Sequence, residues 1–195
     1  MKKTNILAFI LATVCMVSCA DNNSKTATET AKTVAPSADD AVKRGEYLVK
    51  IAGCNDCHSA KKMGAMGPEV IPETMLAGYP ADRPIRKFSD PSIKQGFSMF
   101  YPDLTAAAGP WGVSFAANLT PDETGIGNWT EDQFKKALTQ GKYKGLDGGR
   151  MLLPPMPWVN YTTMADADVK AMYAYLKSIK PVKNLVPQPI TPDKM

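Results

Sequence analysis

The sequence contains 195 residues, with 23 basic and 19 acidic side chains, a formal net charge of +4 and a single histidine. A chain of this length forms one domain, with or without extensions. Its lysines and arginines are scattered and form no basic stripe, so the composition argues against a nucleic-acid partner.

The first residues have the pattern of a bacterial export signal. Lys2 and Lys3 precede an apolar run over residues 6–17, which is short for a membrane-spanning helix. Ser18-Cys19 then resembles a lipoprotein cleavage site, which implies cleavage before Cys19 and acylation of its thiol and new amino group. We predict a signal peptide over residues 1–18, with an ordinary, non-lipidated leader as the alternative. The protein would then be exported and anchored to a membrane, facing the periplasm.

Residues 20 to about 38 contain Ser, Thr, Ala, Asn and Lys and almost no large apolar side chain. Such a segment cannot bury enough surface to fold, so it is predicted to be flexible. We therefore divide the exported chain into a lipidated tether over residues 19–38 and a folded domain over residues 39–195.

Three segments of this domain have helical periodicity. Apolar residues recur on one face through residues 41–52, which Ser37 or Asp39 can cap. Thr130–Gln133 has the form of a capping box at the start of a second helix. A third apolar stripe covers about residues 166–179. The proline-rich tail beyond it is expected to be an extended strap.

Residues between His58 and Trp111 are rich in glycine and proline and show little periodicity. A long irregular segment is uncommon in a compact domain unless something anchors it, and a large flat cofactor would do so. Residues 63–110 are expected to form either a partner-docking surface or a replacement for regular middle helices.

The segment Cys54-Asn55-Asp56-Cys57-His58 has the spacing that attaches a c-type haem. Two thiols one helical turn apart reach the two vinyl groups of one porphyrin edge, and the histidine becomes the proximal iron ligand. A structural zinc site would need four protein ligands, and the two other cysteines lie in the leader. A thioredoxin-like pair would need a βαβ pattern, which is not seen. We predict one covalent haem c, bound by Cys54, Cys57 and His58.

The second face of the iron needs another ligand. The absence of further histidines excludes bis-histidine coordination, which leaves a methionine thioether as the usual partner. Met156 stands out because prolines on both sides restrict its backbone. Met151 is the nearest competitor, Met75 and Met99 lie in loops, and Met172 lies on a helical apolar stripe.

Pro68 is a candidate for orienting the proximal histidine. Its carbonyl oxygen could accept a hydrogen bond from the His58 ring, as groups around metal ligands do. The alternative, which turn chemistry supports equally, is that Gly67-Pro68 is only a turn.

Several motifs occur in order along the chain: Cys-x-x-Cys-His at 54–58, Asn-Leu-Thr-Pro-Asp at 118–122, Thr-Gly-Ile-Gly at 124–127 and Pro-Pro-Met-Pro-Trp at 154–158. Together they resemble class I c-type cytochromes, in particular single-haem cytochromes and cytochrome subunits that accompany bacterial dehydrogenases. The resemblance covers about residues 40–187. It implies an all-α cytochrome c-like fold whose first and last helices cross near one haem edge, with Gly45 at the crossing.

The resemblance also implies roles for individual residues. Cys54 and Cys57 would form the thioether links, with His58 and Met156 as the axial ligands of the iron. Supporting residues around the haem would be Asn118, Trp129 and Trp158, the two tryptophans as pocket walls.

The function that the resemblance implies is one-electron transfer and not enzymatic turnover, in a respiratory or dehydrogenase-linked chain. The redox partner would be a dehydrogenase, an oxidase or another cytochrome. Two alternatives stay open: a tightly bound electron-accepting subunit of a dehydrogenase, and a haem enzyme or gas sensor in which Met156 leaves the iron open.

Overall fold

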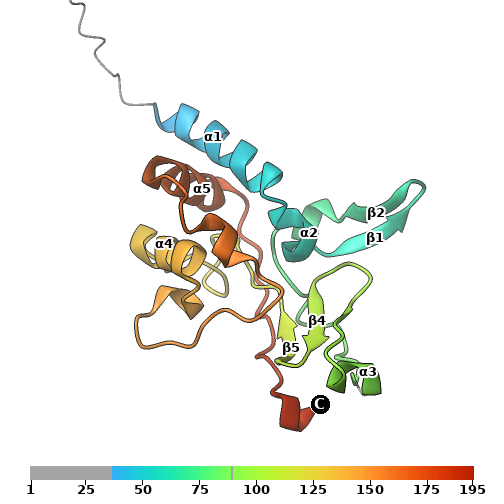
Figure 1. Ribbon diagram of the computed structural model, residues 1–195. Helices are drawn as coiled ribbons and strands as arrows, with labels where there is room; N and C mark the ends of the chain where they lie inside the picture. Colours follow the sequence, from blue (N-terminus) through green and yellow to red (C-terminus); the bar gives the residue numbers. More distant parts are fainter. Residues whose placement is uncertain (1–36, 89) are drawn as a thin grey trace, which may run out of the picture. The chain divides into compact units, whose positions relative to one another are not determined.

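The computed structural model describes residues 37–88 and 90–195. The predicted signal peptide, Cys19 and nearly all of the predicted tether lie outside the described residues. The α-helices of the described part are α1 (Ala38–Ile51), α2 (Cys54–His58), α3 (Pro91–Lys94), α4 (Glu131–Gln140) and α5 (Asp166–Ser178) (Figure 1). Short 3-10 helices are η1 (Pro72–Thr74), η2 (Tyr143–Gly145), η3 (Trp158–Tyr161) and η4 (Pro192–Lys194). None of the helices in this part of the chain is long and apolar enough to cross a membrane.

The prediction of an all-α fold is wrong, because two antiparallel sheets accompany the helices. One is a hairpin of β1 (Lys61–Gly64) and β2 (Gly67–Val70), and the other contains β3 (Met99–Phe100), β4 (Ala106–Gly109) and β5 (Gly112–Phe115) in that order. The four buried residues of β4 are three alanines and a glycine, and both residue types have low strand propensity. Short strands with such residues give no clear period-two pattern, so the sequence did not reveal them.

Local sequence signals explain the helix ends. The Ser37 hydroxyl accepts a hydrogen bond from the amide of Asp40 at the start of α1. Thr130 and Gln133 form the predicted capping box of α4, which ends at Gly141 in the left-handed conformation. These signals fix the first turn of α1 and both ends of α4.

The first and last helices, α1 and α5, pack closely at Gly45, as the sequence predicted. A Cβ atom on Gly45 would clash with the carbonyl oxygen of Ala171 in α5. The Arg44 guanidinium lies 2.9 Å from an oxygen of Asp168 across the same contact. Glycine in this helix costs stability relative to alanine, and the backbone contact explains its presence.

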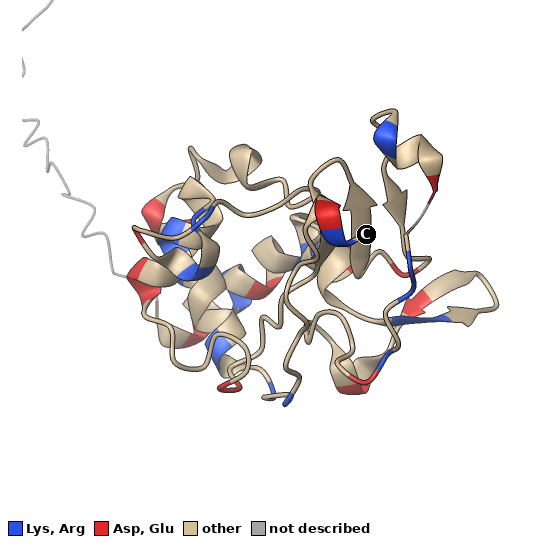
Figure 2. Ribbon diagram, turned by 90° about the horizontal axis from the view of Figure 1, so that it is seen from below, with Lys and Arg blue, Asp and Glu red and all other residues tan. Residues whose placement is uncertain are grey.

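The main core lies among α1, α4 and α5, and its buried residues are Leu48, Val49, Leu76, Ile126, Phe134, Leu138, Val169, Ala171, Met172 and Leu176. The segment after β2 contributes to two further small cores, one around Tyr79 and Tyr101 and one around Ile93 and Val113 of β5, and residues of the chain after α5 pack against both. Residues 63–110 are therefore not an irregular loop, because much of their length folds around these separate clusters. Acidic and basic residues are interspersed along the described part of the chain (Figure 2).

The chain after α5 is an extended strap, as predicted, and it follows the body of the domain to η4. Its Ile190 forms two backbone hydrogen bonds with Val113 of β5, of 2.8 and 3.0 Å. The strap therefore connects the helical core to the three-stranded sheet.

Candidate haem-binding site

The two cysteines lie on α2, a short helix that follows α1 directly. Gly53 joins the two helices in the left-handed conformation, with φ of 68°, which glycine adopts at little cost. Cys54 and Cys57 are both free and partly buried. They are separated by about one turn of the same helix, so both thiols are available to a single planar group.

Burial favours the protonated form of both thiols. It raises the pKa of Cys54 to about 11, and it also raises the pKa of Cys57. A redox-active Cys-x-x-Cys pair has the opposite property, because its attacking thiol has a lowered pKa. The electrostatics therefore disfavour the thioredoxin-like alternative.

The imidazole of His58 is held by a backbone carbonyl. Its Nδ1 atom lies 2.7 Å from the carbonyl oxygen of Ala117. Burial lowers the pKa of His58, against the opposing effect of the Ala117 bond, so the ring is neutral at pH 7. Because a carbonyl can only accept, Nδ1 carries the proton and the lone pair is on Nε2. This tautomer is the one that presents Nε2 to a metal.

The prediction that Pro68 orients His58 is wrong, since Ala117 has this role. Gly67 and Pro68 begin β2, with Pro68 opposite Met63 of β1. The turn of this hairpin is Ala65-Met66, so the alternative interpretation of Gly67-Pro68 as a turn is also wrong. The sequence could not identify Ala117, because a backbone carbonyl acceptor leaves no side-chain signal.

The predicted supporting residue Asn118 follows Ala117 directly and is buried. Its side-chain oxygen accepts hydrogen bonds from the amide and hydroxyl of Thr120, at 2.9 and 2.8 Å. Its amide group donates to the carbonyl of Val182 in the strap at 2.8 Å. Asn118 therefore fixes the loop that contains the His58 acceptor.

Met156 and Trp129 are partly buried and both pack against the main core, which Cys54 also contacts. Met75 borders the same core, whereas Met172 is buried within it. Met151 and Met99 are exposed at 40% and 39% of their surface. Trp158 lies elsewhere, against the end of α4, where a Cβ atom on Gly141 would clash with its indole ring.

Hydrogen bonds on both sides hold the segment that contains Met156. Before it, the Ser114 hydroxyl of β5 donates to the carbonyl of Pro154 at 2.6 Å. After it, the Tyr161 hydroxyl donates to the carbonyl of Ala52 at 3.2 Å, two residues before Cys54. The Tyr161 side chain thus links the segment that contains Met156 to the residues just before α2. No sequence motif had indicated this contact.

These residues fit a covalently attached haem. Two unpaired thiols on one short helix are followed at once by an imidazole whose Nδ1 is occupied and whose Nε2 is free. Within residues 37–88 and 90–195, no group of three or more His, Cys, Asp or Glu residues is arranged to hold a metal ion. The donor set therefore suits an iron porphyrin and not a structural zinc ion.

The fold and this site define a c-type haem-binding domain. Residues 42–180 match the family model described as "Cytochrome c", and the chain therefore belongs to the cytochrome c family. This membership implies covalently bound haem c. It makes the chain an electron-transfer protein and not an enzyme, as the sequence predicted.

Similar proteins include several dehydrogenase subunits. The chain is 31% identical over 180 residues, or 91% of its length, to the "Gluconate 2-dehydrogenase cytochrome c subunit" of Pantoea cypripedii, covering 29% of that protein. It is 32% identical over 151 residues, or 76% of its length, to the "Alcohol dehydrogenase (quinone), cytochrome c subunit" of Gluconobacter oxydans (strain 621H), covering 24% of it. The "Fructose dehydrogenase cytochrome subunit" of Gluconobacter japonicus is 31% identical over 73% of the chain and is covered to 22%. The chain thus spans less than a third of these relatives.

Proposed function

We propose that this chain carries one haem c with His58 and Met156 as axial ligands and accepts electrons from a dehydrogenase. The observation that carries the proposal is the His58–Ala117 hydrogen bond beside two free thiols, since it leaves Nε2 unprotonated at the end of the cysteine helix. A bound haem iron supplies the chemistry, the gain and loss of one electron. The protein holds the group and sets its potential by ligand choice, burial and hydrogen bonding.

Met156 is proposed as the distal ligand on three grounds. Its segment is attached on one side to β5 through Ser114 and on the other to Ala52 through Tyr161. Its own amide forms a turn with the carbonyl of Leu153. A backbone held in this way lowers the entropy cost of presenting the Met156 side chain to a ligand site. A histidine–methionine pair fills both axial sites and suits electron transfer.

The electron donor is proposed from the relatives, whose names place them in gluconate, alcohol and fructose dehydrogenases. A cytochrome subunit in such an assembly receives electrons from the catalytic part of the complex. The present chain covers only a fraction of these subunits, so its own donor is proposed as a dehydrogenase without a named substrate.

Export and membrane anchoring through Cys19 complete the proposal. The leader pattern supports them: two lysines, a short apolar run, and a cysteine after a small residue. Metabolic labelling with a fatty acid tests this part. Wild-type protein should incorporate the label, and Cys19→Ser should not.

The experiment that tests the haem assignment is optical spectroscopy of protein purified from native membranes, with its bound partners identified. We expect a c-type reduced-minus-oxidised spectrum and, in the ferric form, the methionine-to-iron charge-transfer band. Co-purification of a dehydrogenase subunit would support the proposed donor. Absence of the band in native ferric protein would contradict methionine ligation, and isolation as a lone monomer would count against a tight complex.

A further inference from the structure

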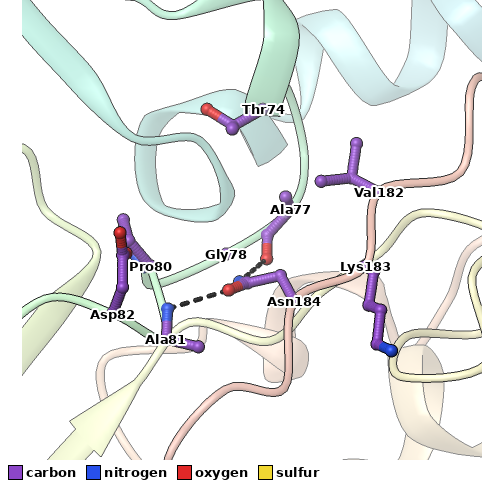
Figure 3. A pocket seen from close by; sticks show the side chains of 9 residues that line it. All are labelled: Thr74, Ala77, Gly78, Pro80, Ala81, Asp82, Val182, Lys183 and Asn184. Carbon is purple, nitrogen blue, oxygen red and sulfur yellow. Dashed lines mark hydrogen bonds between the residues drawn. The ribbon is translucent and has the colours of Figure 1, made fainter.

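The strap after α5 reaches the backbone beside the proximal histidine through one side chain, that of Asn184. Its amide nitrogen donates to the carbonyls of Ala77 at 2.6 Å and Tyr79 at 2.9 Å. Its side-chain oxygen accepts from the amide of Ala81 at 2.8 Å (Figure 3). One side chain therefore binds three backbone groups of the segment over residues 76–81.

This segment contacts His58 directly. The Gly78 amide donates to the His58 carbonyl at 2.8 Å. Segment 76–81 also pairs with the segment over residues 116–119, through backbone hydrogen bonds of 3.0 Å from Tyr79 and 2.8 Å to Leu76. The second segment supplies Ala117, the acceptor for the His58 ring. The histidine is thus held through its main chain by one segment and through its ring by the other.

The two segments fit against each other closely at Gly78. This residue has φ of +80°, and a Cβ atom there would clash with the backbone of Ala116 and Ala117. A displacement of segment 76–81 would therefore be transmitted to the Ala117 carbonyl, because no side chain lies between the two backbones to absorb it.

The backbone of Asn184 also forms hydrogen bonds with side chains of Asn118 and Thr124, in the loop that begins with the segment over residues 116–119. Its amide donates to the Thr124 hydroxyl at 2.9 Å, and its carbonyl accepts from the Asn118 side chain at 3.3 Å. Asn118 directly follows Ala117. Asn184 is consequently bonded to both parts of the chain that hold the histidine.

A cavity of about 280 Å³ lies beside these bonds, lined in part by Ala77, Gly78 and Asn184 (Figure 3). Without the Asn184 amide, the carbonyls of Ala77 and Tyr79 would lose their protein donor. An apolar side chain at position 184 would leave those carbonyls unsatisfied, at a cost that favours local opening of the segment.

We infer that Asn184 is a positioning residue that fixes the His58–Ala117 hydrogen bond and thereby contributes to the reduction potential of the haem. The inference rests on the proposed function, in which His58 is an iron ligand. A hydrogen bond donated by the Nδ1–H group raises the basicity of a ligating imidazole, and a more basic ligand stabilises the ferric state. Weakening this bond therefore raises the potential.

The test compares Asn184→Leu and Asn184→Ala with wild type. Leucine keeps a branched side chain of similar size without the donors and acceptor, and both changes are neutral in charge. Leu185→Ala is the matched control, because Leu185 is the next residue of the strap and is 72% exposed. The readouts are solvent exchange of the His58 Nδ1 proton, followed by NMR in the ferrous protein, and the potential from a spectroelectrochemical titration.

We expect the Nδ1 proton to exchange about tenfold faster or more in both Asn184 variants, since local opening replaces buried hydrogen bonds. Their potentials should be higher than that of wild type, and the control should match wild type in both measurements. A folded Asn184→Leu protein with a wild-type exchange rate, or with an unchanged or lower potential, would overturn the inference. If the alanine variant does not fold, the leucine variant alone decides.

Failure of the proposed function would be visible in the wild-type protein, as the absence of attached haem or of a His58 signal shifted by the haem ring current. Failure of the inference would instead appear as wild-type behaviour of the Asn184 variants in a protein that binds haem normally. The two results are therefore distinguishable.

Discussion

The Nδ1 atom of His58 lies 2.7 Å from the carbonyl oxygen of Ala117, which is 59 positions further along the chain. This relationship fixes the tautomer of the only histidine and leaves one nitrogen free. It also makes the candidate haem site depend on chain segments far from the cysteine motif. The following predictions test the parts of the site separately.

The Cys57→Ala variant removes one of the two proposed attachment points. We expect a haem held by a single thioether, or no covalent haem after maturation, because each cysteine reacts with one vinyl group. Mass spectrometry of the purified polypeptide and the spectrum of its pyridine complex measure this. Normal attachment through two thioethers in the variant would refute the assignment.

The Met156→Ala variant removes the proposed distal ligand without touching the thioethers. We expect the haem to stay attached, the iron to bind added cyanide or imidazole, and the potential to fall, because methionine ligation raises it. Ferric spectra and ligand titrations measure these effects.

Met151→Ala is the control for that experiment, since Met151 is 40% exposed and lies only five residues earlier. It should retain the charge-transfer band and the wild-type potential. An unchanged spectrum in Met156→Ala would show that another methionine is the ligand, with Met75 as the next to be tested.

The Gly78→Ala variant should destabilise the segments that hold His58. The left-handed backbone at Gly78 and the backbone atoms around it leave no room for a Cβ atom. We expect a loss of about 3 kcal/mol or more in the free energy of unfolding, from backbone strain and overpacking together. Denaturant titration measures it, and Gly148→Ala, where a Cβ atom meets no neighbour within 4 Å, should change stability little.

The acid stability of the domain should depend on Asp103. Burial raises the pKa of this carboxyl, but hydrogen bonds from Arg83 and Thr105 outweigh it and lower the pKa below its usual value. The Arg83 guanidinium lies 2.7 Å from the carboxylate. A lowered folded-state pKa contributes stability that is present above the unfolded value, near 4, and is lost as the pH falls through the folded value.

The Asp103→Asn variant tests this contribution by thermal unfolding from pH 7 to pH 2. Its melting temperature should be lower than that of wild type at pH 7, and the difference should shrink as the pH falls. Asp147→Asn, at an exposed ion pair with Lys136, should keep the wild-type pH profile. An equal pH dependence in wild type and Asp103→Asn would contradict the prediction.

Helix-forming and haem-attaching features were readable from the sequence because each is a local pattern. The capping box at Thr130 and the Ser37 cap occur as predicted, as does the close helix contact at Gly45. The Cys54–His58 motif identified the family-defining site. These signals lie within a few consecutive residues, where spacing alone carries the information.

The features that the sequence did not predict depend on contacts between residues far apart in the chain. The alanines of β4 give no strand pattern, so the sheet that makes the fold mixed and not all-α was not foreseen. The Ala117 carbonyl has no side-chain signal, which explains why Pro68 and not Ala117 was considered as the His58 acceptor. Tyr161 and Asn184 also escaped notice, because a single hydroxyl or amide in a loop has no recognisable spacing.

The hydrogen bond between Asn184 and Ala77 spans 107 positions. Asn184, which holds the backbone beside His58, is therefore synthesised much later than His58 itself. Cys54, Cys57 and His58 emerge long before the strap that later secures their surroundings. Because the attachment motif is local, we expect covalent attachment of haem not to depend on the closing of the strap. Changes in the strap are therefore expected to alter the redox properties of the mature protein, while the yield of attached haem stays the same.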